Sequence, residues 1–201
     1  MRQRAFAALM IFPILLAACG ASRDESKVTD FCEALQNQTV SCEAEILSRI
    51  GGESETFALA CAESEQGSEL TLRAPETLTG VTAHVGEDAS LSFDGLVIPV
   101  PAEGLSPLSA VPTLLNALRR GHLDLVWREG DTLTAQFIQT DDLAVRVYFS
   151  PDGLPAAASF LDRGAETITC TITHWTQSDK ENSDEPDDSN LGGDQSQHPG
   201  A

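Results

Sequence analysis

The five cysteines of this 201-residue sequence are the side chains whose chemistry most constrains its function. Four of them, Cys32, Cys42, Cys61 and Cys170, form an even set, which in an exported protein predicts two disulfides with three possible pairings. The fifth, Cys19, then needs a separate role. No CxxC motif and no cluster of histidine and cysteine has the spacing of a zinc site. We therefore expect no metal and no other cofactor.

Cys19 follows a segment that has the order of an export signal. Arginines at positions 2 and 4 precede the uncharged run 5–18, which is shorter than the roughly 20 residues of a membrane-spanning helix. Ordinary cleavage here would leave Cys19 as a free thiol. The Leu-Ala-Ala-Cys segment 16–19 instead resembles the lipobox of bacterial lipoproteins, whose cysteine is diacylated and becomes the new N-terminus. We expect residues 1–18 to be a lipoprotein signal peptide, and Cys19 to anchor the protein, through diacylglycerol and palmitate, to the extracytoplasmic face of the cell membrane.

Composition divides the remaining chain into three parts. Residues 19–27 are polar and are expected to form a lipidated tether. Residues 178–201 hold seven acids and one lysine, with a single leucine as their only large apolar residue. Such a segment cannot bury enough surface to offset its ordering entropy, so it is predicted to be a disordered acidic tail. The segment between them, 28–177, has the length of one domain.

The charge of the chain excludes one class of partner. The formal net charge is −19, and it becomes −21 once the two arginines of the signal segment are removed. No basic patch is present to neutralise phosphates, so nucleic acid is not an expected partner.

Alternating apolar residues predict a hairpin that brings two cysteines together. The runs 40–50 and 55–63 each place apolar side chains on one face, and the two glycines between them suit a two-residue turn. Directly opposite residues of antiparallel strands lie near disulfide distance. The register pairs Ile46 with Phe57, Ala44 with Leu59 and Cys42 with Cys61. We therefore predict a Cys42–Cys61 disulfide, worth roughly 3 kcal/mol, which leaves Cys32 to pair with Cys170.

Most of the other segments read as short strands that alternate on one face only. This pattern predicts an antiparallel sheet with one buried face. A three-residue loop at 129–131 is predicted for one hairpin, and a turn at 150–153 for the next. These registers pair Trp127 with Leu133, Leu125 with Ala135, Leu123 with Phe137, and Val145 with Ala158. In the last strand, Trp175 has the opposite parity to Ile172 and is expected on the outer side.

Two helices are predicted by apolar spacing. Residues 27–38 place an apolar stripe along one helical face, formed by Val28, Phe31, Cys32 and Leu35. Residues 106–121 have the stronger pattern, with Pro112 in the first turn, two arginines in the last turn and Gly121 at the end.

The segments "RAPETLTGVTAHV" and "LSPLSAVPTLLNALRRGHL" resemble parts of the LolA/LolB-like lipoprotein-sorting superfamily. The likeness is to its small lipoprotein members from Gram-positive bacteria, including a clostridial spore germination lipoprotein that partners a cortex-processing amidase. The resemblance covers roughly 28–177. It implies a mainly β fold with two helices: a strongly curved antiparallel sheet, or unclosed β-barrel, of about eleven strands covered by helices. Members of this superfamily bind the acyl chains of lipoproteins, other lipids or protein partners.

The sequence supports two functions, neither of them enzymatic. No GxSxG, HExxH or phosphate-binding loop occurs, and the four histidines are scattered. The first function is binding of a lipid, an acyl chain or a lipoprotein in an apolar β-bowl. The second is an accessory lipoprotein whose bowl is only a filled core and whose surface binds an envelope or spore-cortex protein. The expected lining of the bowl is Phe57, Leu59, Leu72, Phe93, Leu125, Trp127, Phe137 and Val145.

Overall fold

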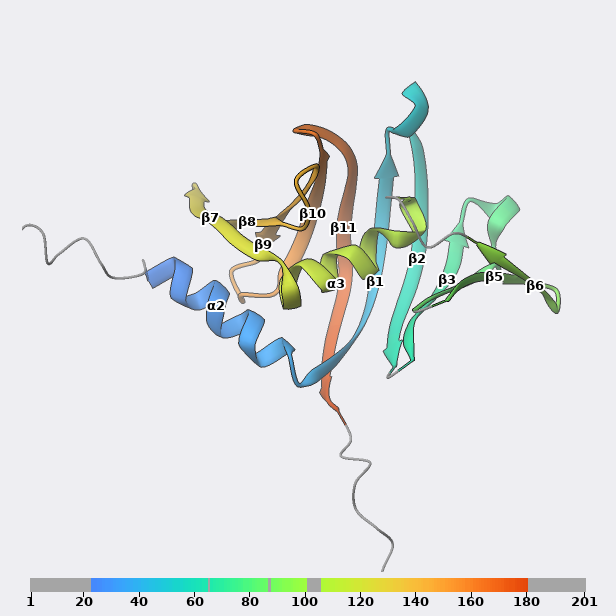
Figure 1. Cartoon of the computed structure of the whole chain (residues 1–201), viewed down its shortest axis with the longest axis horizontal. Coiled ribbons are helices and arrows are strands. Elements are labelled where there is room, and N and C mark those ends of the chain that lie inside the picture. The colour runs from blue at the N-terminus through green and yellow to red at the C-terminus, as the bar shows by residue number, and fades with distance from the viewer. Residues whose placement is uncertain (1–22, 65, 87, 101–105, 181–201) are drawn as a thin grey trace, which may run out of the picture.

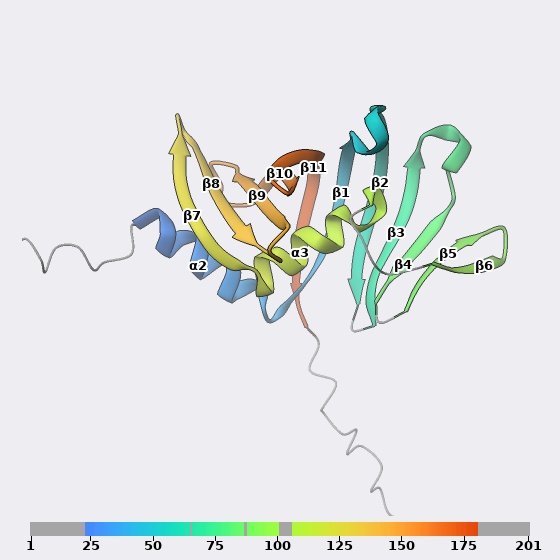
Figure 2. The same ribbon diagram turned by 45° about the horizontal axis from the view of Figure 1, so that its top comes forward.

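The computed structural model describes residues 23–180 apart from 65, 87 and 101–105. These residues form one antiparallel sheet of eleven strands and two α-helices. The sheet is strongly curved and unclosed, and both helices lie on its concave side (Figures 1 and 2). The helices are α2 (Arg23–Leu35) and α3 (Ala110–Arg120). The strands are β1 (Gln38–Ser48), β2 (Glu55–Ser64), β3 (Gly67–Ala74), β4 (Thr82–Val85), β5 (Ala89–Phe93), β6 (Leu96–Val100), β7 (His122–Glu129), β8 (Thr132–Ile138), β9 (Leu143–Phe149), β10 (Pro155–Asp162) and β11 (Ala165–Asp179).

The order of the elements is the one that the family resemblance implied. One helix is followed by six strands, a second helix and five strands. The sheet order is β6-β5-β4-β3-β2-β1-β11-β10-β9-β8-β7, so the first and last long strands meet at its centre and β6 and β7 are its free edges. The predicted fold class, a mainly β, curved and unclosed sheet covered by helices, is confirmed.

The core lies between the concave face of the sheet and the two helices. Helix α3 turns its apolar stripe to the sheet and buries Val111, Leu114, Leu115 and Leu118 completely or almost so. The helix ends at Gly121, whose backbone is extended, and a side chain is excluded there because a Cβ would lie 2.5 Å from the Ala117 carbonyl oxygen. In α2, Val28 and Leu35 are buried, and the Phe31 ring meets Phe149 of β9 edge-on. Both predicted helical stripes therefore pack as expected.

Two predicted boundaries differ from the structure. Helix α2 begins at Arg23, inside the expected tether, because the Asp24 carboxylate accepts two hydrogen bonds from Arg128 of β7 at 2.8 and 2.9 Å. Strand β11 extends to Asp179, two residues into the expected tail, because it stays paired with β1 as far as Gln38. The described residues do not include Cys19, the predicted signal segment 1–18 or the tail residues 181–201.

The predicted β1–β2 register is confirmed, although its turn is not. Cys42 faces Cys61, Ala44 faces Leu59 and Ile46 faces Phe57. Six residues, not two, connect the strands, and they include a short 3-10 helix at Ile50–Gly52. The turn is longer than the predicted one by an even number of residues, so the paired residues are unchanged. The same side chains therefore face the core.

The predicted β9–β10 register is wrong. A bulge between Pro155 and Ala157 shifts the pairing, so Val145 faces Phe160 and not Ala158. All three side chains are nevertheless buried, because the bulge changes the partner while the apolar residues stay on the concave face.

No helix within the described residues combines the length and the apolar character that a bilayer crossing needs.

Candidate functional site

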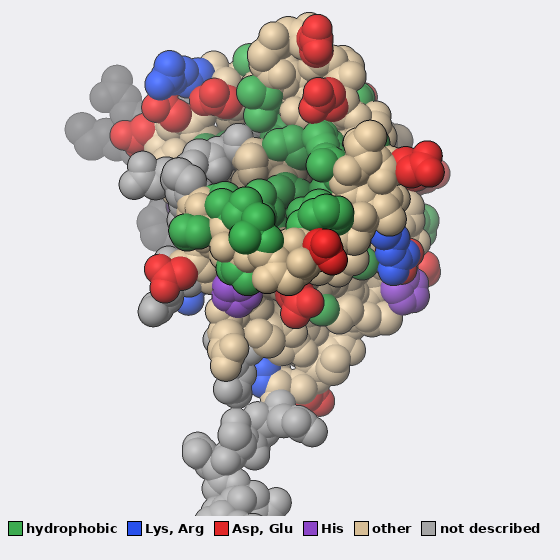
Figure 3. Space-filling view, turned by 90° about the vertical axis from the view of Figure 1, so that its right-hand side faces the viewer, with side chains coloured by type: hydrophobic (Ala, Val, Ile, Leu, Met, Phe, Trp, Pro, Cys, Tyr) green, Lys and Arg blue, Asp and Glu red, His purple; other side chains and the backbone are tan. Residues whose placement is uncertain are grey.

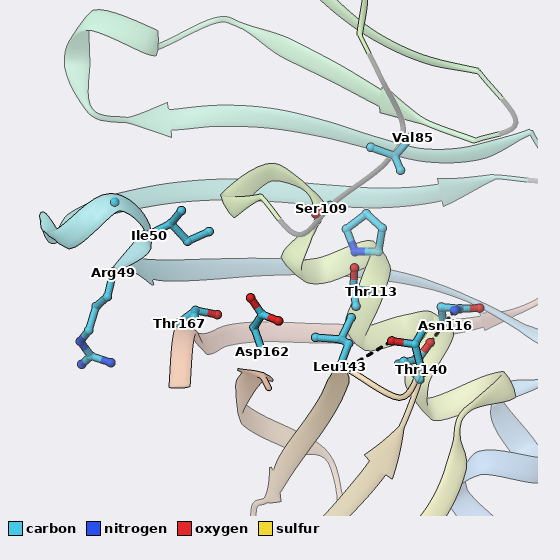
Figure 4. Close-up of a pocket in the computed structure, with 13 residues that line it drawn as sticks. Arg49, Ile50, Val85, Ser109, Thr113, Asn116, Thr140, Leu143, Asp162 and Thr167 are labelled. Carbon is cyan, nitrogen blue, oxygen red and sulfur yellow. Dashed lines mark hydrogen bonds between the residues drawn. The ribbon is translucent and has the colours of Figure 1, made fainter. Parts of the chain in front are cut away.

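A cavity of about 890 Å³ lies between the first half of α3 and one end of the sheet. Loops and strand ends that are far apart in the sequence surround it, and Figure 4 shows them converging on it. Its lining residues are Arg49, Ile50 and Gly51 after β1; Val85 at the end of β4; Ser109, Pro112, Thr113 and Asn116 of α3 and its start; Gln139, Thr140 and Leu143 around the β8–β9 turn; and Asp162 and Thr167 beside the β10–β11 turn.

The walls of this cavity combine apolar side chains with neutral polar ones. Ile50, Val85, Pro112 and Leu143 supply apolar surface from four different segments. In Figure 4 the Ile50 and Leu143 side chains both point into the space below α3. A site with these properties suits a ligand that is mostly apolar and has a few hydrogen-bonding groups.

One polar group of the wall has no partner. The Asn116 side-chain amide donates from Nδ2 to the Gln139 side-chain oxygen Oε1 at 2.8 Å, which fixes the Gln139 side chain. The other end of that side chain, Gln139 Nε2, is buried without a hydrogen bond. A buried donor that is left unpaired costs free energy. This nitrogen is packed beside Gly121, where an added Cβ would lie 2.8 Å from it, and it does not open onto the cavity.

The ionisable groups at the cavity are few. The Arg49 guanidinium donates to the Glu166 carboxylate at 2.9 Å and points away from the cavity (Figure 4). Asp162 is exposed and turns its carboxylate toward the open space. The Ser109 hydroxyl donates to the Ser106 carbonyl oxygen at 3.0 Å, in the 3-10 turn that precedes α3.

The cavity is not the bowl that the sequence predicted. None of the eight residues expected to line a ligand site belongs to its wall. Leu59, Leu72, Phe137 and Val145 are buried in the packed core, and Phe57 is half-buried against it. The two helices therefore fill the centre of the bowl, and the cavity lies at one end of it.

Two of the predicted lining residues lie on the convex face. A two-residue turn at Gly130 and Asp131 pairs Trp127 with Thr134 and Leu125 with Gln136, in place of the predicted three-residue loop. Their side chains consequently point outward. A bulge beside Asp124 restores the predicted pairing of Leu123 with Phe137.

The convex position of these residues is visible in their contacts. The Arg146 guanidinium lies 5.5 Å from the centre of the Trp127 ring, a cation–π contact. Leu125 is 56% exposed. A third predicted residue, Phe93, has core-facing parity but lies at the tip of the β5–β6 hairpin and is also 56% exposed. These three residues do not face a cavity.

Trp175 was expected on the outer side and lies on the inner one. The β1–β11 pairing skips Thr173, so Trp175 faces Cys42 and packs against the core. Its indole Nε1 is buried without a hydrogen-bond partner. One bulged residue is enough to reverse the parity of everything that follows it.

The four described cysteines are free thiols in the structure, and three of them are buried. A hydrogen bond with Cys42, followed by burial, raises the pKa of Cys61 far above its usual range. Burial, with a smaller contribution from Cys61, raises the pKa of Cys170 to about 12, and burial alone raises the pKa of Cys32 to about 11. Cys42 faces Cys61 across β1 and β2, and the bond between them stays a prediction. The Cys32–Cys170 bond stays a prediction.

An ion pair that the sequence did not reveal joins both helices to the sheet. Arg119, at the end of α3, donates two hydrogen bonds to the Glu63 carboxylate, one of them at 2.7 Å. It also donates to the carbonyl oxygens of Leu35 at 3.2 Å and Gln38 at 2.8 Å. The Val40 amide donates to Glu63 at 3.0 Å. We call this group the Arg119–Glu63 clasp; it fixes the ends of α2 and α3 opposite the cavity-forming end of α3.

Comparison with known proteins gives matches of structure only. No family model matches the chain, and no curated protein matches it. The chain is similar to a putative outer membrane lipoprotein-sorting protein domain from Vibrio parahaemolyticus, with 13% identity, coverage of 75% of this chain and 91% of that one, and a TM-score of 0.43. The likeness is one of fold.

Two other solved structures are similar to the same extent. A LolA superfamily protein from Nitrosomonas europaea has 10% identity, covers 78% of this chain and 94% of its own, and has a TM-score of 0.41. Mycobacterium tuberculosis lipoprotein LppX has 16% identity, covers 81% of this chain and 95% of its own, and has a TM-score of 0.39.

Proposed function

We propose that this chain is an extracytoplasmic lipoprotein that binds an amphipathic, lipid-like ligand in the cavity beneath α3. The observation that carries the proposal is the cavity itself: about 890 Å³ of open space beside the packed core. Ligand sites typically occupy roughly 300–1,000 Å³ and combine apolar walls with a small number of directed polar groups. An acyl chain would contact Ile50, Pro112 and Leu143.

The anchoring part of the proposal rests on the sequence. Cys19 stands four positions before the first residue of α2. A fully extended chain covers at most about 3.6 Å per residue, so a lipid on Cys19 would hold the domain close to the bilayer. A ligand site near the membrane suits a protein that receives or presents a membrane-derived molecule. We also propose that the Cys42–Cys61 disulfide forms in the oxidising compartment that this location implies.

The choice of binding over catalysis follows from the lining. Arg49 and Asp162 are its two ionisable side chains, and Arg49 is already paired. Nothing in this wall could both activate a nucleophile and stabilise the charge that develops on a substrate.

Native mass spectrometry tests the proposal. The full chain carrying Cys19→Ala would be purified without detergent, since we expect this variant to leave the membrane. The proposal expects a protein peak with the added mass of one bound lipid, which disappears after organic extraction. A protein that shows only its own mass, and that takes up no added fatty acid, would contradict it.

A further inference from the structure

The β5–β6 hairpin exposes a compact group of apolar side chains far from the cavity lining. Phe93 is 56% exposed, Leu96 and Val97 are each 63% exposed, and Ile98 is 50% exposed. We call these four residues the β6 patch. Figure 3 faces this end of the molecule and shows apolar side chains gathered there, with acidic side chains around them. Larger contiguous apolar surfaces of this kind mark interaction sites.

Strand β6 has the composition of an interior strand, although it lies at an edge of the sheet. Its sequence, Leu-Val-Ile-Pro-Val, is apolar at every position, and side chains on both of its faces are exposed. Strands with continuous apolar runs are normally covered on both faces. Edge strands are normally protected by charged residues; here the only protective feature within β6 is Pro99. Among the described strands β5 alone pairs with β6, so within the described residues the other edge of β6 has no partner strand.

The charge of this region selects the partner. The sequence from 74 to 118 contains five acidic residues and no lysine or arginine. Two of the acids lie at the two ends of β6: Asp94 is in the turn before it, and Asp88 precedes Ala89, which pairs with Val100. An apolar edge with an acid at each end complements a strand that carries apolar and basic side chains.

We propose that β6 is a docking edge for an extended segment of another protein that has alternating apolar and basic side chains. The segment would add a twelfth strand beside β6, form backbone hydrogen bonds with the free edge and cover the β6 patch. A second copy of this chain would bring the same acids to the same edge, and an anionic bilayer would meet negative charge as well. Both are less favourable occupants than a basic segment. This proposal goes beyond lipid binding and uses none of the cavity residues.

The test uses two labelled octapeptides, one of alternating lysine and valine and one of alternating glutamate and valine. Fluorescence anisotropy would measure their binding to the full Cys19→Ala chain. The key variant is Val97→Ser with Ile98→Ser, because it removes apolar surface and leaves the net charge unchanged. Its matched control is Leu125→Ser, which removes an equally exposed apolar side chain from the opposite edge strand. A second variant, Asp88→Asn with Asp94→Asn, removes the acids at the ends of β6.

The proposal expects saturable binding of the lysine–valine peptide and no binding of the glutamate–valine peptide. The serine variant of β6 should weaken binding about tenfold or more, a difference of about 1.4 kcal/mol, while Leu125→Ser should leave it unchanged. The asparagine variant should weaken binding most at low salt. Equal binding of both peptides, or unchanged binding by the serine variant of β6, would overturn the proposal. Two other results would also overturn it. If sedimentation showed a dimer of the parent chain that the serine variant dissociates, the occupant would be a second copy. If the wild-type protein bound anionic vesicles and the serine variant did not, the occupant would be a bilayer.

Discussion

Replacing Glu63 with Gln should destabilise the domain more than any exposed ion-pair substitution. The side chains of Arg119 and Glu63 are only 17% and 11% exposed, so the substitution would leave a largely buried guanidinium without its anion. Removing one partner of a fully buried pair costs roughly 3–5 kcal/mol. The lower end applies here, because Arg119 keeps its bonds to two carbonyl oxygens and the Val40 amide keeps an oxygen acceptor. We expect a loss of about 3 kcal/mol.

Thermal and urea unfolding of the full chain, followed by circular dichroism, would measure this loss. For a domain of this size, about 1 kcal/mol corresponds to a shift in Tm of roughly 2–4 °C, so Glu63→Gln should lower Tm by about 6–12 °C. The matched control is Glu43→Gln, which breaks the pair between Glu43 and Arg73 at 2.7 Å. Those side chains are 43% and 55% exposed, and surface pairs are worth about 0–1 kcal/mol. If Glu63→Gln shifted Tm no more than Glu43→Gln does, the clasp would not hold the helices to the sheet.

Three further predictions test the register, the disulfide and the anchor. Phe137→Arg should unfold the domain by burying an unpaired charge, whereas Leu125→Arg on the convex face should shift Tm by less than about 2 °C. Circular dichroism melts would measure both variants, and equal effects would refute the observed β7–β8 register. Non-reducing peptide mapping of exported protein should join Cys42 to Cys61; a different linkage for either residue would contradict the proposal. Cys19→Ala should abolish palmitate labelling and move the protein out of the membrane fraction, and a variant that still labels would show that Cys19 is not the acylated residue.

The parts of the fold that the sequence predicted are those with redundant local signals. In the β1–β2 hairpin, two apolar pairs and one cysteine pair all require the same register, so an error in the turn length did not matter. In α3, the apolar spacing, the arginines and Gly121 agree on one helix. Local agreement of this kind is what makes a segment predictable.

The register errors arise from two local features, bulges and turn length. Bulges near Asp124, Ala156 and Thr173 each insert a residue that has no partner opposite it. A single insertion reverses inward and outward positions, and no composition signal marks where it occurs. Trp175 was misplaced for this reason, and a turn one residue shorter than predicted misplaced Trp127.

The candidate site was missed because tertiary structure assembles it. Its walls come from turns and strand ends, such as Ile50, Thr140 and Asp162, whose individual sequences look like ordinary loops. The partners of the Arg119–Glu63 clasp are 56 positions apart, and nothing local connects them. The sequence pointed to the apolar strand faces as a ligand site, but α2 and α3 cover those faces and leave the space at the end of the sheet.

Titration with an environment-sensitive fluorescent fatty acid tests the central claim most directly. The full Cys19→Ala chain would be compared with two substitutions at Thr113, whose side chain lies in the cavity wall (Figure 4). Thr113→Val keeps the volume of the side chain, and Thr113→Trp places a bulky indole inside the cavity. We predict saturable binding of one probe per chain that Thr113→Val retains and Thr113→Trp loses, with both variants as stable as the parent chain. The cavity would not be a lipid site if a folded Thr113→Trp variant bound the probe as tightly as the parent chain does. The same would follow if the parent chain showed no saturable binding.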